Sequence, residues 1–267
     1  MPVDPAKPRK VLVVHGVELG TNADLDQDTL VNDLIKARLA GLPLQYEVDL
    51  YRYENINDTA QANFKVLVDL VAATPLNAIL ANTTIDMVGD VVIALEDGST
   101  AAVIRDGLRQ RIIDVFESEQ PCYVVAHSLG SIYAFDVINA LMETQGYFDR
   151  DSRKTWPVQG LVTLGSPIGL AMFKVGSRQR VAALGAGNKW FRWLNYWDRT
   201  DPVVSGEIFG TQLSGLRIAE KYVTDDPNQG WVIRDRPTDT GRVWLMAHVA
   251  YWHNPMVGDG LVDLITN

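Results

Sequence analysis

The chain is predicted to be an α/β protein with a mostly parallel central sheet flanked by helices. Segments of strand and helix character alternate along nearly all of its 267 residues, which is typical of parallel strands joined by helical crossovers. Several strand segments are continuous apolar runs, as expected of strands buried on both faces. We find no internal repeat and no interdomain linker in the sequence, so we expect a single domain over residues 1–267.

The first third of the chain contains two predicted strands and one predicted helix. Residues 11–14 (Val-Leu-Val-Val) form a β-branched run that ends at His15-Gly16. Apolar residues then recur at helical spacing over residues 29–39, and Gly41 and Pro43 end that helix. Residues 44–53 alternate loosely between apolar and polar and are predicted to form a second strand.

A long stretch of helical character follows, and its first part is unusually apolar. Residues 58–100 are predicted to be a helical insertion or cap, interrupted by Pro75 and Gly89. These helices either line an apolar pocket or pack as ordinary core, because periodicity does not separate the two. Asp86 and Asp90 within them are capping or surface residues, or lie beneath the site. Residues 101–116 have the pattern of a regular amphipathic helix.

The remaining elements continue the alternation. We expect strands at residues 122–125, 158–164, 189–197 and 216–224, helices at 131–141 and 256–265, and a mostly polar loop at 225–241. A further short strand is expected just before His248.

One turn in this order has the pattern of a nucleophile. An apolar strand beginning at Cys122 runs into Ala126-His127-Ser128-Leu129-Gly130, and a helix follows at once. Such a turn strains the backbone at the serine and exposes its hydroxyl at the edge of the sheet. The small residues Ala126 and Gly130 let strand and helix pass each other closely. The alternative is that Ser128 is simply a helix N-cap.

Composition excludes several other functions. The net charge of −9 argues against a nucleic-acid partner. Cys122 is the single cysteine, so no intramolecular disulfide forms and a reducing, cytoplasmic location is the simpler interpretation. The N-terminus lacks a signal-peptide pattern, and no apolar run is long enough for a membrane span. The sequence contains no metal-binding motif and we expect no cofactor.

A serine becomes a nucleophile when a histidine acts as base and a carboxylate orients that histidine. Asp201 follows the aromatic-rich predicted strand, and His248 comes later in the chain. Serine, acid and histidine therefore occur in the order known for α/β-hydrolases.

On these residues, the sequence resembles α/β-hydrolases of the esterase/lipase kind. The resemblance is carried by Val14-His15-Gly16, residues 126–130, Thr163-Leu164-Gly165-Ser166-Pro167, Asp201-Pro202-Val203-Val204 and residues 247–252. It implies an α/β-hydrolase fold and an acyl-enzyme mechanism without metal or cofactor. The sequence departs from the family at Ala126, where glycine is more common. It also begins at the His-Gly strand, which implies a sheet shortened at its N-terminal side.

The resemblance assigns a role to each residue. Ser128 attacks the acyl carbonyl, His248 transfers the proton and Asp201 orients His248. The backbone N–H groups of Leu129 and Val17 are expected to form the oxyanion hole.

Each role has a rival in the sequence. Asp198 competes with Asp201, which we favour because Asp-Pro-Val-Val resembles the family's acid loop. His253 competes with His248 and is expected at a helix surface or a pocket rim. Ser166 is rejected as nucleophile because Pro167 has no N–H to offer an oxyanion. His15 and His127 are expected to be structural or to line the pocket.

The predicted function is cleavage of carboxylic esters, with a small-molecule or lipid-like substrate carrying an apolar acyl group. Thioester or amide hydrolysis, peptidase activity and acyl transfer would use the same residues, so they stay open. The alternative from another class is a non-catalytic binding protein on the same fold.

Overall fold

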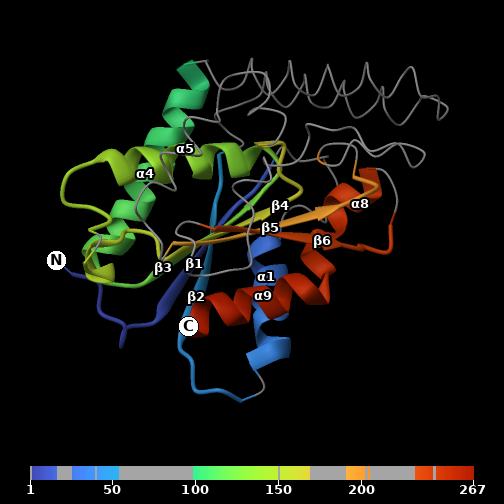
Figure 1. Cartoon of the computed structure of the whole chain (residues 1–267), viewed down its shortest axis with the longest axis horizontal. Helices are drawn as coiled ribbons and strands as arrows, with labels where there is room; N and C mark the ends of the chain where they lie inside the picture. The colour runs from blue at the N-terminus through green and yellow to red at the C-terminus, as the bar shows by residue number, and fades with distance from the viewer. Residues whose placement is uncertain are drawn as a thin grey trace.

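The computed structural model describes residues 2–16, 26–39, 41–53, 99–149, 151–168, 191–201, 204, 232–242 and 245–267, with the backbone alone at 232, 233 and 245. Within these residues, six parallel strands form one sheet in the order β2-β1-β3-β4-β5-β6 (Figure 1). The strands are β1 (Arg9–Val14), β2 (Tyr46–Tyr51), β3 (Cys122–His127), β4 (Gly160–Leu164), β5 (Arg192–Asp198) and β6 (Val232–Thr238). The helices are α1 (Gln27–Leu39), α4 (Ser99–Glu117), α5 (Leu129–Glu143), α8 (Leu245–Val249) and α9 (Pro255–Thr266), with short 3-10 helices η3 (Arg153–Thr155) and η5 (Ala250–His253).

The described helices cover both faces of this sheet. Figure 1 shows α4 and α5 on one face and α1 and α9 on the other. The strands supply both cores because successive side chains point to opposite faces. Leu12 and Val14 belong to the apolar cluster under α4 and α5, whereas Val11 and Val13 belong to the cluster under α1 and α9. The described part is therefore an α/β sandwich of three layers.

The strand register brings the candidate residues to one edge of the sheet. Val14 pairs with Ala126, and His127 pairs with Leu164. Since all strands are parallel, their carboxyl ends lie along the same edge. The segments after β1, β3, β4 and β5 carry Gly16, Ser128, Gly165 and Asp201, and they start from that edge.

Most predicted elements are confirmed where the structure describes them. The expected strands at residues 11–14, 44–53, 122–125, 158–164 and 189–197 correspond to β1 to β5, and the expected helices at 29–39, 101–116, 131–141 and 256–265 correspond to α1, α4, α5 and α9. Cys122 is fully buried as expected, and burial raises the pKa of its thiol to about 12. The strand predicted at 216–224 and residues 58–98 of the expected insertion lie outside the described residues; residues 99 and 100 belong to α4.

Two predictions near the end of the chain are wrong. Residues 225–241 were expected to be a loop, but they contain β6, whose charged residues suppressed the strand signal. Asp235 of β6 accepts hydrogen bonds at 2.8 Å from Asn195 Nδ2 and from Trp197 Nε1, both on β5. Those partners stabilise a strand that has little apolar character of its own. In addition, His248 lies within the short helix α8 and not directly after a strand.

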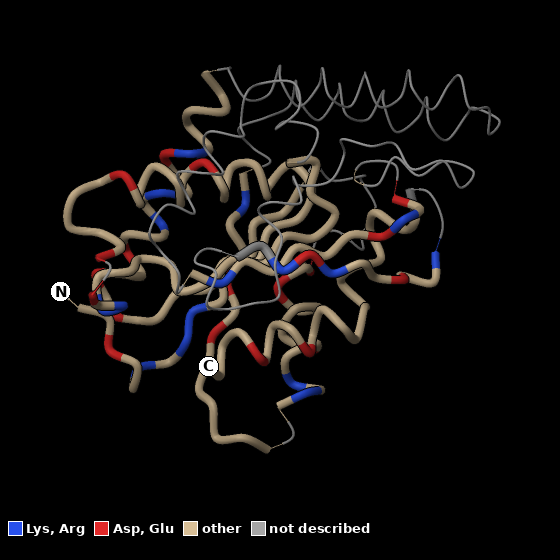
Figure 2. The backbone as a smooth tube through the Cα atoms, viewed as in Figure 1, with Lys and Arg blue, Asp and Glu red and all other residues tan. Residues whose placement is uncertain are grey.

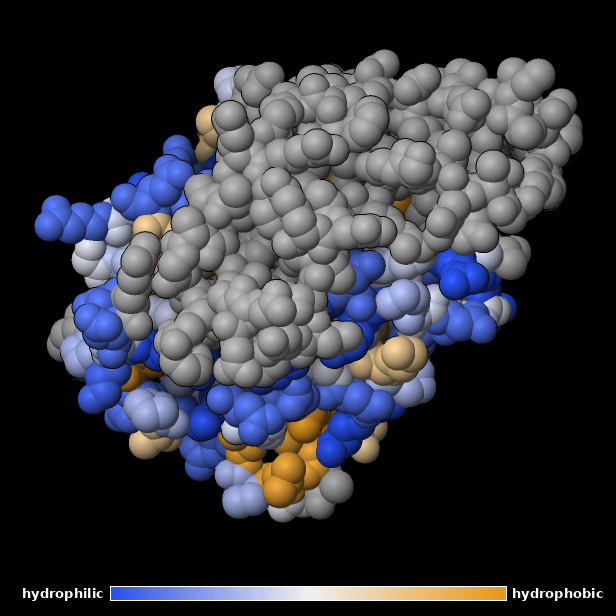
Figure 3. Space-filling model, viewed as in Figure 1, coloured by the Kyte–Doolittle hydropathy of each residue, from blue (hydrophilic) through white to orange (hydrophobic). Residues whose placement is uncertain are grey.

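The described surface is mainly polar and of mixed charge. Figure 2 shows lysine and arginine interspersed with aspartate and glutamate along the described chain. On the face in Figure 3, hydrophobic residues gather in a small group at the lower edge, amid hydrophilic ones. The large hydrophobic residues exposed in the described part are Leu42, Val103, Met246 and Met256. None of the described helices combines the length and the apolar character that a membrane crossing needs.

Candidate active site

Ser128 occupies a strained turn between β3 and α5. Its φ of 51° and ψ of −130° lie in a region that L-residues rarely adopt. Its N–H donates a hydrogen bond to the carbonyl of Leu164 at 3.0 Å, which ties the turn to the end of β4. Ser128 stands at the N-cap position of α5, yet its side chain makes no capping hydrogen bond. The interpretation of this hydroxyl as a simple helix cap is therefore not supported.

Two glycines make this turn sterically possible. A Cβ added at Gly130 would lie 2.1 Å from the carbonyl oxygen of His15, so the start of α5 can approach the end of β1 only without a side chain. A Cβ added at Gly16 would lie 2.5 Å from the Cβ of Ser128. Glycine at these two positions therefore allows the segments after β1 and β3 to approach each other. This agrees with the prediction that a small residue at position 130 lets the strand and the helix pass closely. Ala126, the other small residue of the turn, is fully buried.

A chain of hydroxyl groups holds the carbonyl side of the same turn. The carbonyl of Ser128 accepts hydrogen bonds from the N–H of Ser131 at 3.0 Å and from its Oγ at 2.5 Å. The Oγ of Ser131 lies 2.6 Å from the Oγ of Ser166, which in turn accepts the N–H of Ile168 at 3.2 Å. Since the Ser131 proton is used on a carbonyl, Ser166 donates to Ser131. The buried Ser166 thus connects the end of β4 to the start of α5 through Ser131. No pattern in the sequence indicated this hydrogen bond.

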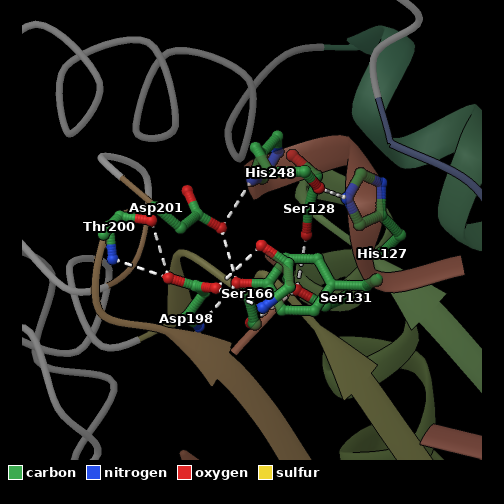
Figure 4. A network of polar contacts seen from close by, with 10 residues as sticks. His127, Ser128, Ser131, Ser166, Asp198, Thr200, Asp201 and His248 are labelled. Atoms are coloured by element: carbon green, nitrogen blue, oxygen red, sulfur yellow. Dashed lines mark hydrogen bonds and ion pairs between the residues drawn. The ribbon is translucent and has the colours of Figure 1, made fainter. Parts of the chain in front are cut away.

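Asp201 and His248 form a buried pair beside this turn. The Nδ1 of His248 lies 2.9 Å from Oδ2 of Asp201, and the two side chains are 3% and 0% exposed. A carboxylate accepts hydrogen bonds and does not donate them, so Nδ1 of His248 carries a proton that it donates to Asp201. Nε2 is buried and has no hydrogen-bond partner among the described residues. Figure 4 shows the side chain of His248 directed toward Asp201.

The absence of a side chain at Gly165 leaves room for the hydrogen bond between Asp201 and His248. The residue has a φ of 54°, and a Cβ there would lie 3.0 Å from both Oδ2 of Asp201 and Nδ1 of His248. Any larger residue at the end of β4 would therefore push into the hydrogen bond. The sequence marked Gly165 only as part of a strand-end motif, and its contact with Asp201 and His248 depends on the sheet.

Asp198, the rival acid, is occupied elsewhere. Its Oδ1 accepts the N–H and the hydroxyl of Thr200 at 2.7 Å each, and its Oδ2 accepts the N–H of Thr240 at 2.7 Å and its hydroxyl at 2.8 Å. Burial raises the pKa of this carboxyl, but the four donors outweigh burial and the net pKa is lowered. Asp198 therefore fixes the loop that carries Asp201, and Asp201 is the carboxylate that contacts His248 (Figure 4).

His127 supports His248 from the side of the nucleophile turn. Its Nε2 lies 2.7 Å from the backbone carbonyl of His248, and the two ring centroids are 4.7 Å apart. Because a carbonyl only accepts, Nε2 of His127 carries the proton. Burial and then the nearby His248 lower the pKa of His127 well below its usual value, so the ring stays neutral. This matches the structural role expected for His127.

The other candidate residues are placed as follows. His15 is buried, and its ring stacks on Tyr53 with centroids 4.3 Å apart. His253 is exposed at the end of η5, as expected of a residue outside the site. Leu129 is the first residue of α5, where N–H groups lack an acceptor within the helix. Val17 lies outside the described residues, so its proposed N–H donor is not placed.

The arrangement can perform nucleophilic chemistry by a serine. Asp201 and His248 are joined by a hydrogen bond, and Ser128 follows β3 at the same edge of the sheet, where ligands bind in open α/β sheets; Nε2 of His248 makes no hydrogen bond to Ser128. The described residues contain no group of three or more His, Cys, Asp or Glu side chains arranged to hold a metal ion. A scan against models of known protein families finds no match to the chain. A search of the curated proteins finds no significant match either.

Proposed function

We propose that this protein is a serine hydrolase of the α/β-hydrolase kind that cleaves carboxylic esters through an acyl-enzyme intermediate. The observation that carries the proposal is the buried His248. Its Nδ1 is bound to Asp201, its Nε2 has no partner among the described residues, and its backbone carbonyl is bound by His127, the residue before Ser128. A binding protein without chemistry has no evident need for a strained serine beside such a pair.

In the proposed reaction, Oγ of Ser128 attacks the acyl carbon while Nε2 of His248 takes the hydroxyl proton. The carbonyl oxygen becomes an oxyanion, bound by the N–H of Leu129 and, in our proposal, that of Val17. The C–O bond to the alcohol then breaks, and the alcohol leaves with the proton from His248. Water repeats the sequence on the acyl-enzyme, losing a proton to His248 as it adds, and Ser128 recovers that proton when the acid leaves.

The strand order is compatible with the proposal at the level of the fold. The order β2-β1-β3-β4-β5-β6 is compatible with an α/β-hydrolase and equally with a Rossmann-like sheet. In either case the direction of winding reverses between β1 and β3, and ligands bind outside the carboxyl ends of strands at such a point. Gly16 and Ser128 lie there. Thioesterase, amidase, peptidase and acyltransferase activities would use the same residues, and the apolar acyl group remains a prediction from residues 58–100.

The test is covalent labelling with an active-site fluorophosphonate. We expect the wild-type protein to be labelled at Ser128 and to hydrolyse p-nitrophenyl esters, measured from acetate to palmitate. Ser128→Ala should lose both labelling and turnover, whereas Ser118→Ala, which removes the hydroxyl of a serine at the end of α4, should keep both. Labelling at another residue, or full turnover by Ser128→Ala, would overturn the proposal.

The base is tested by a pair of histidine variants. His248→Ala should lose about three orders of magnitude or more in turnover, because nothing else takes the proton from Ser128. The exposed His253 is its matched control, and His253→Ala should keep most of the activity. Equal losses in the two variants would contradict the assignment of His248.

A further inference from the structure

Tyr251 forms a bridge behind the candidate acid. It lies in η5, and its side chain is fully buried. Its hydroxyl is 2.8 Å from Oδ2 of Asp201 and also 2.8 Å from the backbone nitrogen of Asp198. The oxygen Oδ2 of Asp201 thus meets both the phenol of Tyr251 and Nδ1 of His248.

The direction of the two hydrogen bonds at Tyr251 follows from their partners. A backbone N–H can only donate, so the phenol oxygen accepts from Asp198. The single proton of the phenol must then be donated to Asp201. Burial first, and then the charge of Asp201, raise the pKa of Tyr251 well above its usual value, so the phenol remains a donor at all physiological pH.

The surroundings of the phenol leave it little freedom. Gly165 lies against the ring, because a Cβ there would be 2.8 Å from Cε2 of Tyr251. The ring centroid of His127, at the end of β3, is 6.2 Å away. The charged and titratable groups that face Tyr251 are thus Asp198 and Asp201 after β5, His127 and, through Oδ2, His248.

We propose that Tyr251 is a positioning residue of the hydrolase: its phenol fixes the carboxylate of Asp201 toward His248 and shares the negative charge of Oδ2 with the imidazole. This inference rests on the proposed function, because it gives Tyr251 a role in that same site. The hydrogen bonds of the phenol go to Asp198 and Asp201. The phenol acts through Asp201, by competing with Nδ1 of His248 for one oxygen.

If the phenol of Tyr251 and Nδ1 of His248 compete for Oδ2 of Asp201, removing the phenol hydroxyl should change the pH dependence of catalysis. A residue that only packs in the core would not have this effect. Tyr251→Phe leaves the ring in place and removes the donor, so more negative charge stays on Oδ2 and the protonated imidazole is bound more strongly. We expect the acid limb of the pH profile of kcat/KM to move to higher pH, and kcat to fall about tenfold because Asp201 is held less firmly. Tyr51→Phe is the matched control, since its hydroxyl binds backbone groups of α4, donating to the carbonyl of Ile104 and meeting Leu108.

A second variant covers the case in which Tyr251→Phe fails to fold. Site-specific replacement of Tyr251 by 3,5-difluorotyrosine keeps the hydroxyl and makes it a stronger donor. The acid limb should then move to lower pH, opposite to Tyr251→Phe. An unmoved acid limb in the difluorotyrosine protein, or a shift in the same direction for both variants, would overturn the proposal.

A measurement without substrate separates this inference from the proposed function. The proton on Nδ1 of His248 should give a far-downfield 1H NMR signal in the free protein, moving downfield in Tyr251→Phe and upfield with difluorotyrosine. If those shifts occur in a protein that fluorophosphonate does not label, the phenol positions Asp201 but the hydrolase proposal is wrong. If labelling occurs and the signal does not respond to either variant, Tyr251 is only part of the core.

Discussion

At the scale of single residues, two positive φ angles define the site. Ser128 has a φ of 51° after β3, and Gly165 has a φ of 54° after β4. Such a backbone costs a side-chain-bearing residue about 1–3 kcal/mol and costs glycine little. At Ser128 the strain is held by neighbours, with Ser131 binding its carbonyl and Gly16 leaving room at its Cβ. At Gly165, both the positive φ and the close contacts that a Cβ would make with Tyr251, Asp201 and His248 favour glycine.

The first prediction at this scale concerns Gly165→Ala. The added methyl group would lie 2.8 Å from Tyr251 and 3.0 Å from Asp201 and His248, so it should displace the acid–base pair. We expect turnover to fall at least about tenfold, since such sites lose function on displacements of about 1 Å. Steady-state kinetics measure this. The matched control is Gly146→Ala, where φ is 94° and nothing lies within 4 Å of the new Cβ; similar losses of turnover in both variants would refute the steric argument.

The second prediction separates the two acids. Asp201→Asn should reduce kcat by about four orders of magnitude, as loss of the orienting carboxylate does in serine hydrolases. Asp198→Asn should reduce stability by about 1–3 kcal/mol through its lost charged hydrogen bonds and leave much more activity. Kinetics and urea unfolding of both variants measure the two effects. A larger kinetic loss in Asp198→Asn would mean that the wrong carboxylate is assigned.

At the scale of elements, the site depends on how β6 and α9 are joined. Asn254 is the N-cap of α9, and its Oδ1 accepts the N–H of Met256 at 2.9 Å. Its Nδ2 donates to Oγ1 of Thr238 and to the carbonyl of Asp239, each at 2.9 Å. One buried side chain thus links the end of β6 to the start of α9, directly after the segment that carries Tyr251.

Asn254→Ala tests this link. The variant loses a cap and leaves buried polar groups without a partner, so we expect the free energy of unfolding to fall by about 2–3 kcal/mol. The control is Ser152→Ala, which removes the side-chain capping bond of η3, 3.3 Å long, and should lower the free energy of unfolding by about 0.5 kcal/mol, the low end for a lost cap. Chemical denaturation followed by circular dichroism measures both. Equal effects would show that the link contributes no more than an ordinary cap.

The sequence predicted elements well where their own residues carried the signal. The run from Cys122 to Ala126 is apolar and the turn after it contains Gly130, so the strand and the strained turn at Ser128 could both be predicted. The strand β6 was missed because Asp235 gains its partners from β5, and no local pattern records them. The contacts of Gly165 and Tyr251 with Asp201 could not be predicted for the same reason, because each joins segments that are distant in the chain.

At the scale of the whole molecule, buried His127 couples stability to pH. The folded state holds the pKa of His127 well below the 6.5 of an unperturbed histidine, because burial and the nearby His248 disfavour its charge. Below about pH 6.5 the unfolded chain therefore takes up a proton that the folded chain does not, and stability falls as pH falls. The lowered pKa of Asp198 acts in a separate window, since its contribution is lost only below about pH 4.

We therefore expect the free energy of unfolding to contain a contribution from His127 of about 1.4 kcal/mol per pH unit between pH 6 and pH 5. His127→Gln keeps a donor for the carbonyl of His248 and does not titrate, so its stability should fall less steeply over this range. Urea unfolding at pH 7, 6 and 5 measures both slopes. Parallel curves for the wild type and His127→Gln would show that His127 does not contribute.

The pairing of β1 with β3 also sets when the turn at Ser128 can form during synthesis. Val14 of β1 pairs with Ala126 of β3, so the two strands beside the turn at Ser128 come from widely separated parts of the chain. Such non-local pairings form slowly, because a long loop must close first. Asp201 and His248 come later still. In the hydrolase that we propose, a polypeptide growing on the ribosome therefore contains Ser128 before His248 has been made, so ester cleavage can begin only after the segment with His248 has been added.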